Sequence, residues 1–167
     1  MTASFKQKYA SGFTLVETLV AVSILLVSIS GPLTLATRGI SSALFARDQI
    51  TASYLAQEAV EYARNIRDEN TLVGNSWLTG LSSCVGATCV VDLPNDTIDT
   101  CTGACAEGAV LYDASSNLYN HATGSATPYT RTMTLSTISA TEVAVVVTVS
   151  WTTGTLSRSV VAREHIH

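Results

Sequence analysis

Four cysteines lie close together and have the most distinctive chemistry in the chain. Cys84, Cys89, Cys101 and Cys105 fall within 22 residues, in a stretch rich in glycine, threonine and serine. An even number of clustered cysteines in such a stretch favours disulfides and an oxidising compartment. The local pairs Cys84–Cys89 and Cys101–Cys105 are slightly favoured, because each brackets a glycine-containing loop. Nested pairing, a zinc site built from the four thiolates, and free thiols remain open alternatives.

Aspartates in the same part of the chain raise the question of a metal. Asp92, Asp96 and Asp99 lie between the two cysteine pairs, and Asp113 follows them. Carboxylate oxygens suit calcium, but no EF-hand spacing is present, and aspartates in loops usually face water. The three residues between the cysteine pairs are therefore no more than calcium candidates, and we expect neither a metal site nor a cofactor.

The three histidines give no catalytic pattern. His121, His165 and His167 are scattered, and the sequence contains no Ser-His-Asp order, glycine-rich phosphate loop or HExxH segment. We therefore expect the protein not to be an enzyme.

One carboxylate interrupts a long apolar run near the N-terminus. Residues 13–37 contain a single charged side chain, Glu17. As a helix this run is roughly 38 Å long, more than the roughly 30 Å of a bilayer's hydrocarbon core. A lone charge deep in an apolar environment is costly. Glu17 therefore either lies near the membrane boundary or pairs with a cation. Gly31 and Pro32 predict a kink in the last third of the run.

The remaining elements follow from hydrophobic periodicity. Residues 38–69 continue the helix with an amphipathic pattern. The segment 70–128 is rich in glycine and small polar residues, which predicts loops with a few short strands. The cysteines would lie in a loop at about 80–120. From about 129 to 164 the period becomes two, and three antiparallel strands are expected near 129–138, 141–152 and 155–164. The sequence thus predicts an α+β fold, in which the amphipathic half of one long helix packs on a small antiparallel sheet.

Charge excludes one class of partner. Both lysines precede Gly12, and the remainder carries seven arginines against thirteen acidic residues, a formal charge of −6. An acidic surface gains nothing from releasing phosphate counterions, so no nucleic-acid binding is expected.

The N-terminus resembles a known family. A short basic leader ends in Gly12 and is followed by Phe13-Thr14-Leu15-Val16-Glu17 and an apolar helix. This arrangement resembles the signature of type IV prepilins, shared by type IV pilins and by the pseudopilins of secretion and DNA-uptake systems. A long helix followed by a small antiparallel sheet is also similar to the plan of that family, so the resemblance extends the predicted fold to a pilin-like one.

The resemblance implies processing and a location. A prepilin peptidase would cut after Gly12, removing the leader at residues 1–12, and Phe13 would become the N-terminus, usually N-methylated. Residues 13–37 would then form a transmembrane or filament-core helix. The protein would cross the inner membrane once, with its C-terminal domain outside the cytoplasm, and would later join an extracellular or periplasmic filament. Its implied partners are other pilin subunits, the peptidase, the inner-membrane assembly platform and membrane lipid.

The resemblance also implies a role for Glu17. Its carboxylate would pair with the amino group of Phe13 in a neighbouring subunit and so set the stagger between subunits. The start Glu17-Thr18-Leu19-Val20-Ala21, the Ala/Gln/Glu-rich helix and the valine-rich last strands resemble minor subunits that prime or cap a filament. A major pilin, or an adhesive tip protein that binds through the 80–120 loop, is the alternative.

Overall fold

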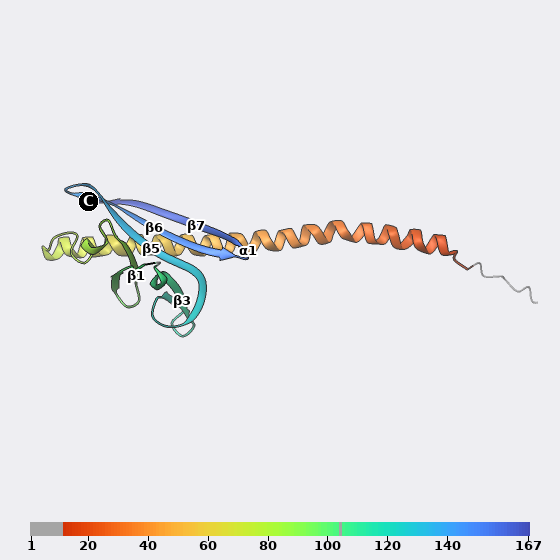
Figure 1. Cartoon of the computed structure of the whole chain (residues 1–167), viewed down its shortest axis with the longest axis horizontal. Helices are drawn as coiled ribbons and strands as arrows, with labels where there is room; N and C mark the ends of the chain where they lie inside the picture. The colour runs from red at the N-terminus through yellow and green to blue at the C-terminus, as the bar shows by residue number, and fades with distance from the viewer. Residues whose placement is uncertain (1–11, 104) are drawn as a thin grey trace, which may run out of the picture. The chain divides into compact units, whose positions relative to one another are not determined.

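The computed structural model describes residues 12–103 and 105–167. The predicted leader, apart from Gly12, lies outside the described residues. The chain divides after Phe45 into an N-terminal unit and a globular unit, Ala46–His167. One helix, α1 (Leu15–Val73), contributes to both, and the strands all belong to the globular unit (Figure 1).

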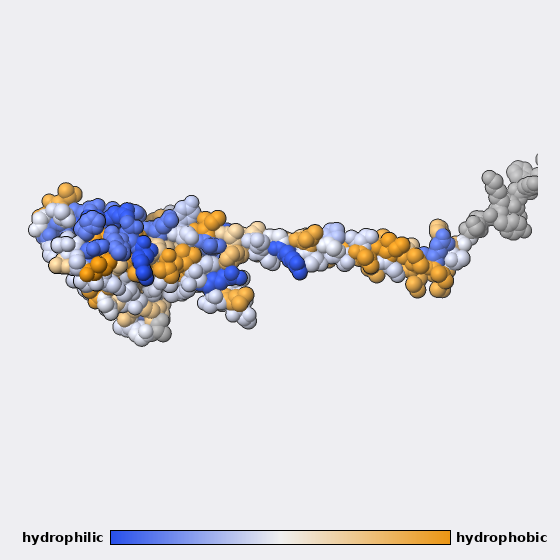
Figure 2. Space-filling view, turned by 90° about the horizontal axis from the view of Figure 1, so that it is seen from above, coloured by the Kyte–Doolittle hydropathy of each residue, from blue (hydrophilic) through white to orange (hydrophobic). Residues whose placement is uncertain are grey.

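The N-terminal unit is helical and exposes its apolar side chains. Every described residue up to Phe45 is exposed, and Leu15, Val27 and Leu35 keep more than 70% of their surface accessible. Figure 2 shows this stretch largely in the colour of hydrophobic residues. By length and composition, α1 is sufficient to cross a membrane.

Hydroxyl side chains within this apolar run bond to their own helix. Ser23 Oγ donates to the Leu19 carbonyl at 2.8 Å, and Ser28 Oγ donates to the Ile24 carbonyl at 2.7 Å. Thr18, Ser30, Thr34 and Thr37 do the same with carbonyls three or four residues earlier. Such bonds leave no hydroxyl proton to be satisfied by solvent, so these residues are compatible with an environment that contains no water.

A glycine ends the helix. Gly74 has φ +79°, in the left-handed region, and its N–H donates to the Thr71 carbonyl. Asn75 N–H donates to the Asn70 carbonyl at 2.8 Å. These two bonds form a Schellman motif, which satisfies carbonyls that the last turn would otherwise leave unpaired. The helix therefore extends past the end expected near residue 69 and stops at Gly74-Asn75, a dipeptide that is typical of turns.

In the part of the chain that the structure describes, the sheet has seven strands, and each pair of neighbouring strands is antiparallel. The long strand β5 (Ser125–Ser139) pairs on one side with β6 (Glu142–Thr153), which pairs with β7 (Leu156–Ile166). On its other side β5 pairs with β1 (Thr88–Asp92) and β3 (Ala109–Asp113). The strand β2 (Thr97–Thr100) pairs with β1, and β4 (Leu118–Asn120) pairs with β3. Two short 3-10 turns, η1 (Ser82–Cys84) and η2 (Ala106–Gly108), precede β1 and β3.

The core lies between α1 and the inner face of β5–β7 (Figure 1). The helix contributes mainly small residues, Ala52, Ala56, Ala59 and Ala63, each fully buried, together with Leu55. Alternate residues of β6 meet them: Val143, Val145, Val147, Val149 and Trp151 are all at most 3% exposed. Burial of alternate residues is expected for an antiparallel sheet with one covered face.

The predicted α+β class, with one long helix and an antiparallel sheet, is confirmed. The sheet is larger than the predicted meander, because β1 and β3 from the loop region pair directly with β5. Helix burial begins only at Ala52, so Ile40 and Leu44, which lie in the first part of the predicted amphipathic segment 38–69, stay exposed. The helix runs without a break through Gly31 and Pro32, and the kink remains a prediction.

Candidate functional site

The predicted cleavage site lies directly before α1. Gly12, Phe13 and Thr14 are exposed and precede the first helical residue. A Cβ placed on Gly12 would meet nothing within 4 Å, so the fold of this chain does not require glycine there. Phe13 keeps 82% of its surface exposed although it is a large apolar residue. Both residues are available to an outside partner, and neither contributes to the globular core.

Glu17 lies in the first turn of the helix, three residues after its cap. The Glu17 main-chain N–H donates to Thr14 Oγ1 at 3.3 Å, which makes Thr14 the N-cap of α1. Threonine followed three residues later by glutamate is the capping-box pattern. Sequence reasoning considered Glu17 only as a charge and missed this cap. A carboxylate in the first turn is also stabilised by the positive end of the helix dipole.

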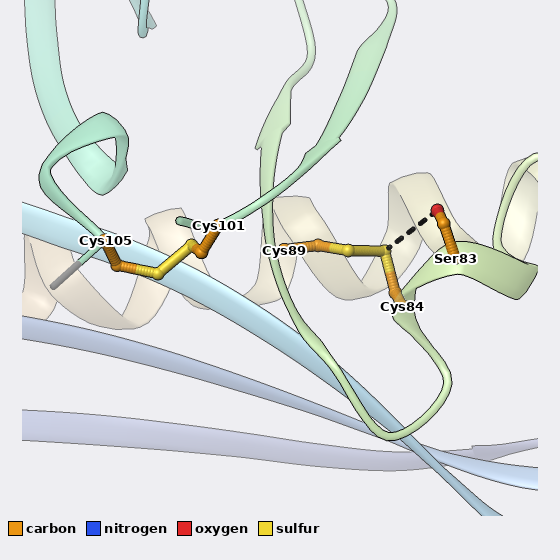
Figure 3. Close-up of a disulfide and its surroundings, with 5 residues drawn as sticks. All are labelled: Ser83, Cys84, Cys89, Cys101 and Cys105. Carbon is orange, nitrogen blue, oxygen red and sulfur yellow. Dashed lines mark hydrogen bonds between the residues drawn. A yellow bond between two sulfur atoms is a disulfide. The ribbon is translucent and has the colours of Figure 1, made fainter. Parts of the chain in front are cut away.

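The four cysteines form two local disulfides, Cys84–Cys89 and Cys101–Cys105, with Cα–Cα distances of 5.6 and 5.0 Å (Figure 3). The first is fully buried and joins η1 to β1, where both sulfurs belong to the hydrophobic core. The second is partly exposed and closes the connection between β2 and η2. The zinc and nested-pairing alternatives are wrong, because each thiol is bonded to its near neighbour.

Two of the three candidate calcium ligands, Asp92 and Asp96, already have other partners. Asp92 is buried, and its Oδ2 accepts hydrogen bonds from Asn95 Nδ2 at 2.9 Å and from the His121 main-chain N–H at 3.0 Å. Asp96 accepts a hydrogen bond from the Tyr62 hydroxyl at 2.6 Å. Burial and the neighbouring Asp96 raise the pKa of Tyr62. Within the described residues, no group of three or more His, Cys, Asp or Glu side chains has the geometry to hold a metal ion.

Asp99 is exposed and lines a cleft of about 500 Å³ together with Glu107 and His121. Asp113, the fourth aspartate considered, caps its own turn by accepting hydrogen bonds from Ser115 and Ser116. These bonds to Ser115 and Ser116 hold the pKa of Asp113 below its usual value. Asp92 and Asp99 thus line one cleft, whereas Asp96 and Asp113 have separate partners elsewhere in the loop region.

A buried arginine is the polar feature that sequence reasoning missed. Arg131 on β5 is 1% exposed, and its Nη1 lies 2.9 Å from Glu58 Oε2 on α1. Its Nη2 donates to the Val91 carbonyl of β1 at 2.8 Å. The same guanidinium therefore bridges the helix, β5 and β1. The sequence did indicate that Arg131 is buried, since it occupies the same face of the strand as the apolar residues Met133 and Leu135.

Burial lowers the pKa of Arg131, and the attraction of Glu58 opposes that shift. A guanidinium remains charged in proteins, so the fold must compensate a permanent buried cation. It does so with one carboxylate and main-chain carbonyls, including that of Leu55 at 3.4 Å.

Comparison with known families identifies the N-terminal segment. Residues 7–31 match the family described as the prokaryotic N-terminal methylation motif. No curated protein and no solved structure matches the chain significantly. The matched segment includes Gly12, Phe13 and Glu17 and runs into the exposed apolar helix. The chain therefore carries the N-terminal signature of type IV prepilins and pseudopilins, and its helix-plus-sheet architecture is consistent with a pilin fold.

Proposed function

We propose that the protein is a structural subunit of a type IV pilus-like filament, made as a prepilin and assembled through α1. The observation that carries this proposal is the methylation motif leading directly into an apolar helical stretch whose side chains, up to Phe45, are all exposed among the described residues. Pilins are structural subunits and not enzymes, and a single apolar helix fits a protein that crosses the inner membrane once before assembly.

Processing follows from the residues before the helix. A prepilin peptidase cuts after Gly12, and Phe13 becomes a free, then methylated, N-terminus on the cytoplasmic side. The remaining chain divides into a membrane or filament-core helix at 13–37, an amphipathic part at 38–69 and the globular region at 70–167 outside the cytoplasm. The exposed, unpacked Gly12 supports this step, because a peptidase needs an accessible bond.

Assembly then depends on Glu17. The α-amino group of Phe13 in one subunit pairs with the Glu17 carboxylate of the next, while both apolar helices bury against each other. At about 4 Å and an effective dielectric of about 20, such a pair attracts by about 4 kcal/mol before desolvation is subtracted. A subunit in the wrong register leaves a charge unpaired in an apolar bundle, which is costly. The pair therefore selects one stagger.

We further propose that the protein is a minor subunit that primes or caps the filament. The Ala/Gln/Glu-rich helix and the valine-rich strands β6 and β7 support this assignment by their likeness to minor subunits. Its abundance in sheared filaments relative to the main subunit tests it. An abundance equal to that of the main component would identify a major pilin.

The filament proposal is tested with Glu17→Ala in the native host. We expect processing at Gly12 to continue, seen as the mass of the mature chain, while incorporation into filaments is lost. The Thr14 cap survives this change, since it uses the main-chain N–H of residue 17. Glu69→Ala, an exposed acid near the other end of the same helix, is the matched control and should assemble normally. Normal incorporation of Glu17→Ala would contradict the proposal.

A further inference from the structure

One histidine contacts the buried arginine on the side away from the helix. His121 follows β4 and is half-buried, with Nε2 3.5 Å from Arg131 Nη2. Its Nδ1 lies 2.9 Å from the Ala109 carbonyl oxygen. A carbonyl only accepts, so Nδ1 carries the proton, and the lone pair of Nε2 is directed at an arginine that only donates. The contact therefore requires a neutral imidazole in one tautomer.

Protonation of the imidazole would turn this attractive contact into a repulsive one. A proton on Nε2 would place a donor against a donor and a cation against the Arg131 cation. Arg131 is held by two further contacts, with the Glu58 carboxylate and with the Val91 carbonyl. On protonation, it is therefore the imidazole that is expected to move away from Arg131.

Acidic groups line the cleft onto which His121 opens. Asp99 of β2 and Glu107 of η2 line the cleft of about 500 Å³ into which His121 opens. Asp92 of β1 is a buried carboxylate that accepts a hydrogen bond from the His121 main-chain N–H. On α1, Glu58 faces the ring only through Arg131. A charged imidazole therefore finds repulsion on the arginine side and carboxylates on the cleft side.

We propose that His121 and Arg131 form an acid-sensitive latch between the loop region and the sheet. At neutral pH the imidazole closes the latch by accepting a hydrogen bond from Arg131. In acid the protonated ring leaves Arg131 for the carboxylates of the cleft, and the segment around β4 loses one of its attachments to β5 and α1. The latch is a property of the globular unit and does not depend on filament assembly.

The direction of the pH effect follows from the environment of the ring. Burial first, and the charge of Arg131 second, lower the pKa of His121, although the Ala109 carbonyl and Asp92 oppose them. The folded chain therefore binds this proton less readily than the unfolded chain does, whose imidazole pKa is about 6.5. Stability contributed by the closed latch is present above that value and is lost as the pH falls towards the lower pKa of the folded state.

Hydrogen exchange of the full chain in detergent micelles tests the latch. From about pH 7.5 to about pH 5, a range that brackets the imidazole pKa, we expect protection of the amides at 118–124 to fall severalfold after correction for intrinsic rates. In His121→Gln the side-chain amide oxygen accepts from Arg131 at both values, so protection should stay constant. His165→Gln, which removes a histidine of β7 paired with Glu142 of β6, should respond like the wild type. An equal response in His121→Gln, or none in the wild type, would overturn the proposal.

A second measurement needs no variant. Nitrogen-15 chemical shifts of the imidazole rings report which nitrogen carries the proton. At neutral pH we expect the His121 ring to be protonated at Nδ1 and bare at Nε2. The opposite tautomer, or a charged ring at neutral pH, would exclude a hydrogen bond accepted from Arg131 and with it the latch.

Discussion

The helix α1 is exposed on all sides in the N-terminal unit but buries one of its faces in the globular unit. Up to Phe45 all described side chains are exposed, and the hydroxyls bond back to the helix that carries them. From Ala52 onward one face of the helix packs into the hydrophobic core that it shares with the sheet. The first unit therefore depends on its surroundings to cover its apolar surface, whereas the second contains its own core. Sequence changes should accordingly act on assembly in one unit and on folding in the other.

The largest difference is expected for the same substitution made in each unit. Leu55→Ala removes a side chain that is 2% exposed and should lower the free energy of unfolding by about 2–5 kcal/mol. Leu25→Ala removes one that is 58% exposed and should leave that free energy unchanged. Urea denaturation of both variants in detergent micelles, followed by circular dichroism, measures the contrast. Equal losses would mean that the N-terminal unit packs within the chain after all.

Glycine-to-alanine substitutions in the two units are expected to change stability in opposite directions. Gly124 has φ +129°, and a Cβ there would lie 2.5 Å from the Tyr112 carbonyl oxygen, so Gly124→Ala should destabilise the globular unit by about 1–3 kcal/mol. Gly39 lies inside the helix, and a Cβ there meets nothing within 4 Å. Gly39→Ala should therefore stabilise the helix by up to about 1 kcal/mol. Thermal unfolding of the two variants measures both signs, and a destabilised Gly39→Ala would reveal a close neighbour at that site.

The smallest effect is expected at the start of the helix. Thr14→Ala removes the side-chain oxygen that caps Glu17 N–H and should cost the first turn about 1 kcal/mol. Amide exchange of residues 15–18 in micelles should quicken, while unfolding of the globular unit stays the same. Thr14→Ser keeps the capping oxygen and serves as the control. Fraying in both variants would show that the hydroxyl is not what stabilises this turn.

Periodic features of the fold could be predicted from the sequence. The helix follows from an unbroken apolar run joined to an amphipathic one, and the β6 pattern of valines at every second residue sets its buried face. The Gly74-Asn75 turn located the end of the helix better than the change in composition near residue 69 did. The local disulfides could also be predicted, because the two cysteines of each pair are four or five positions apart in the sequence.

The features that were missed depend on contacts between distant parts of the chain. Cys89 pairs with Met133 in the sheet, 44 positions later, and no local pattern specifies that partner. Arg131 is similar, since its partners Glu58 and Val91 lie 73 and 40 residues away in the sequence. A charge on the inward face of a strand was the available clue. It indicated that a partner must exist but not which one.

The position of β5 has a consequence for how such a chain can change. One edge of β5 holds the β6–β7 hairpin, and the other holds the two small hairpins β1–β2 and β3–β4. The turn at 114–117 lies at the exposed tip of β3–β4, far along the chain from every residue of the helix core. We expect foreign peptides grafted at that tip to leave the β6–β7 hairpin and α1 unchanged, so the tip is a suitable place to display an epitope.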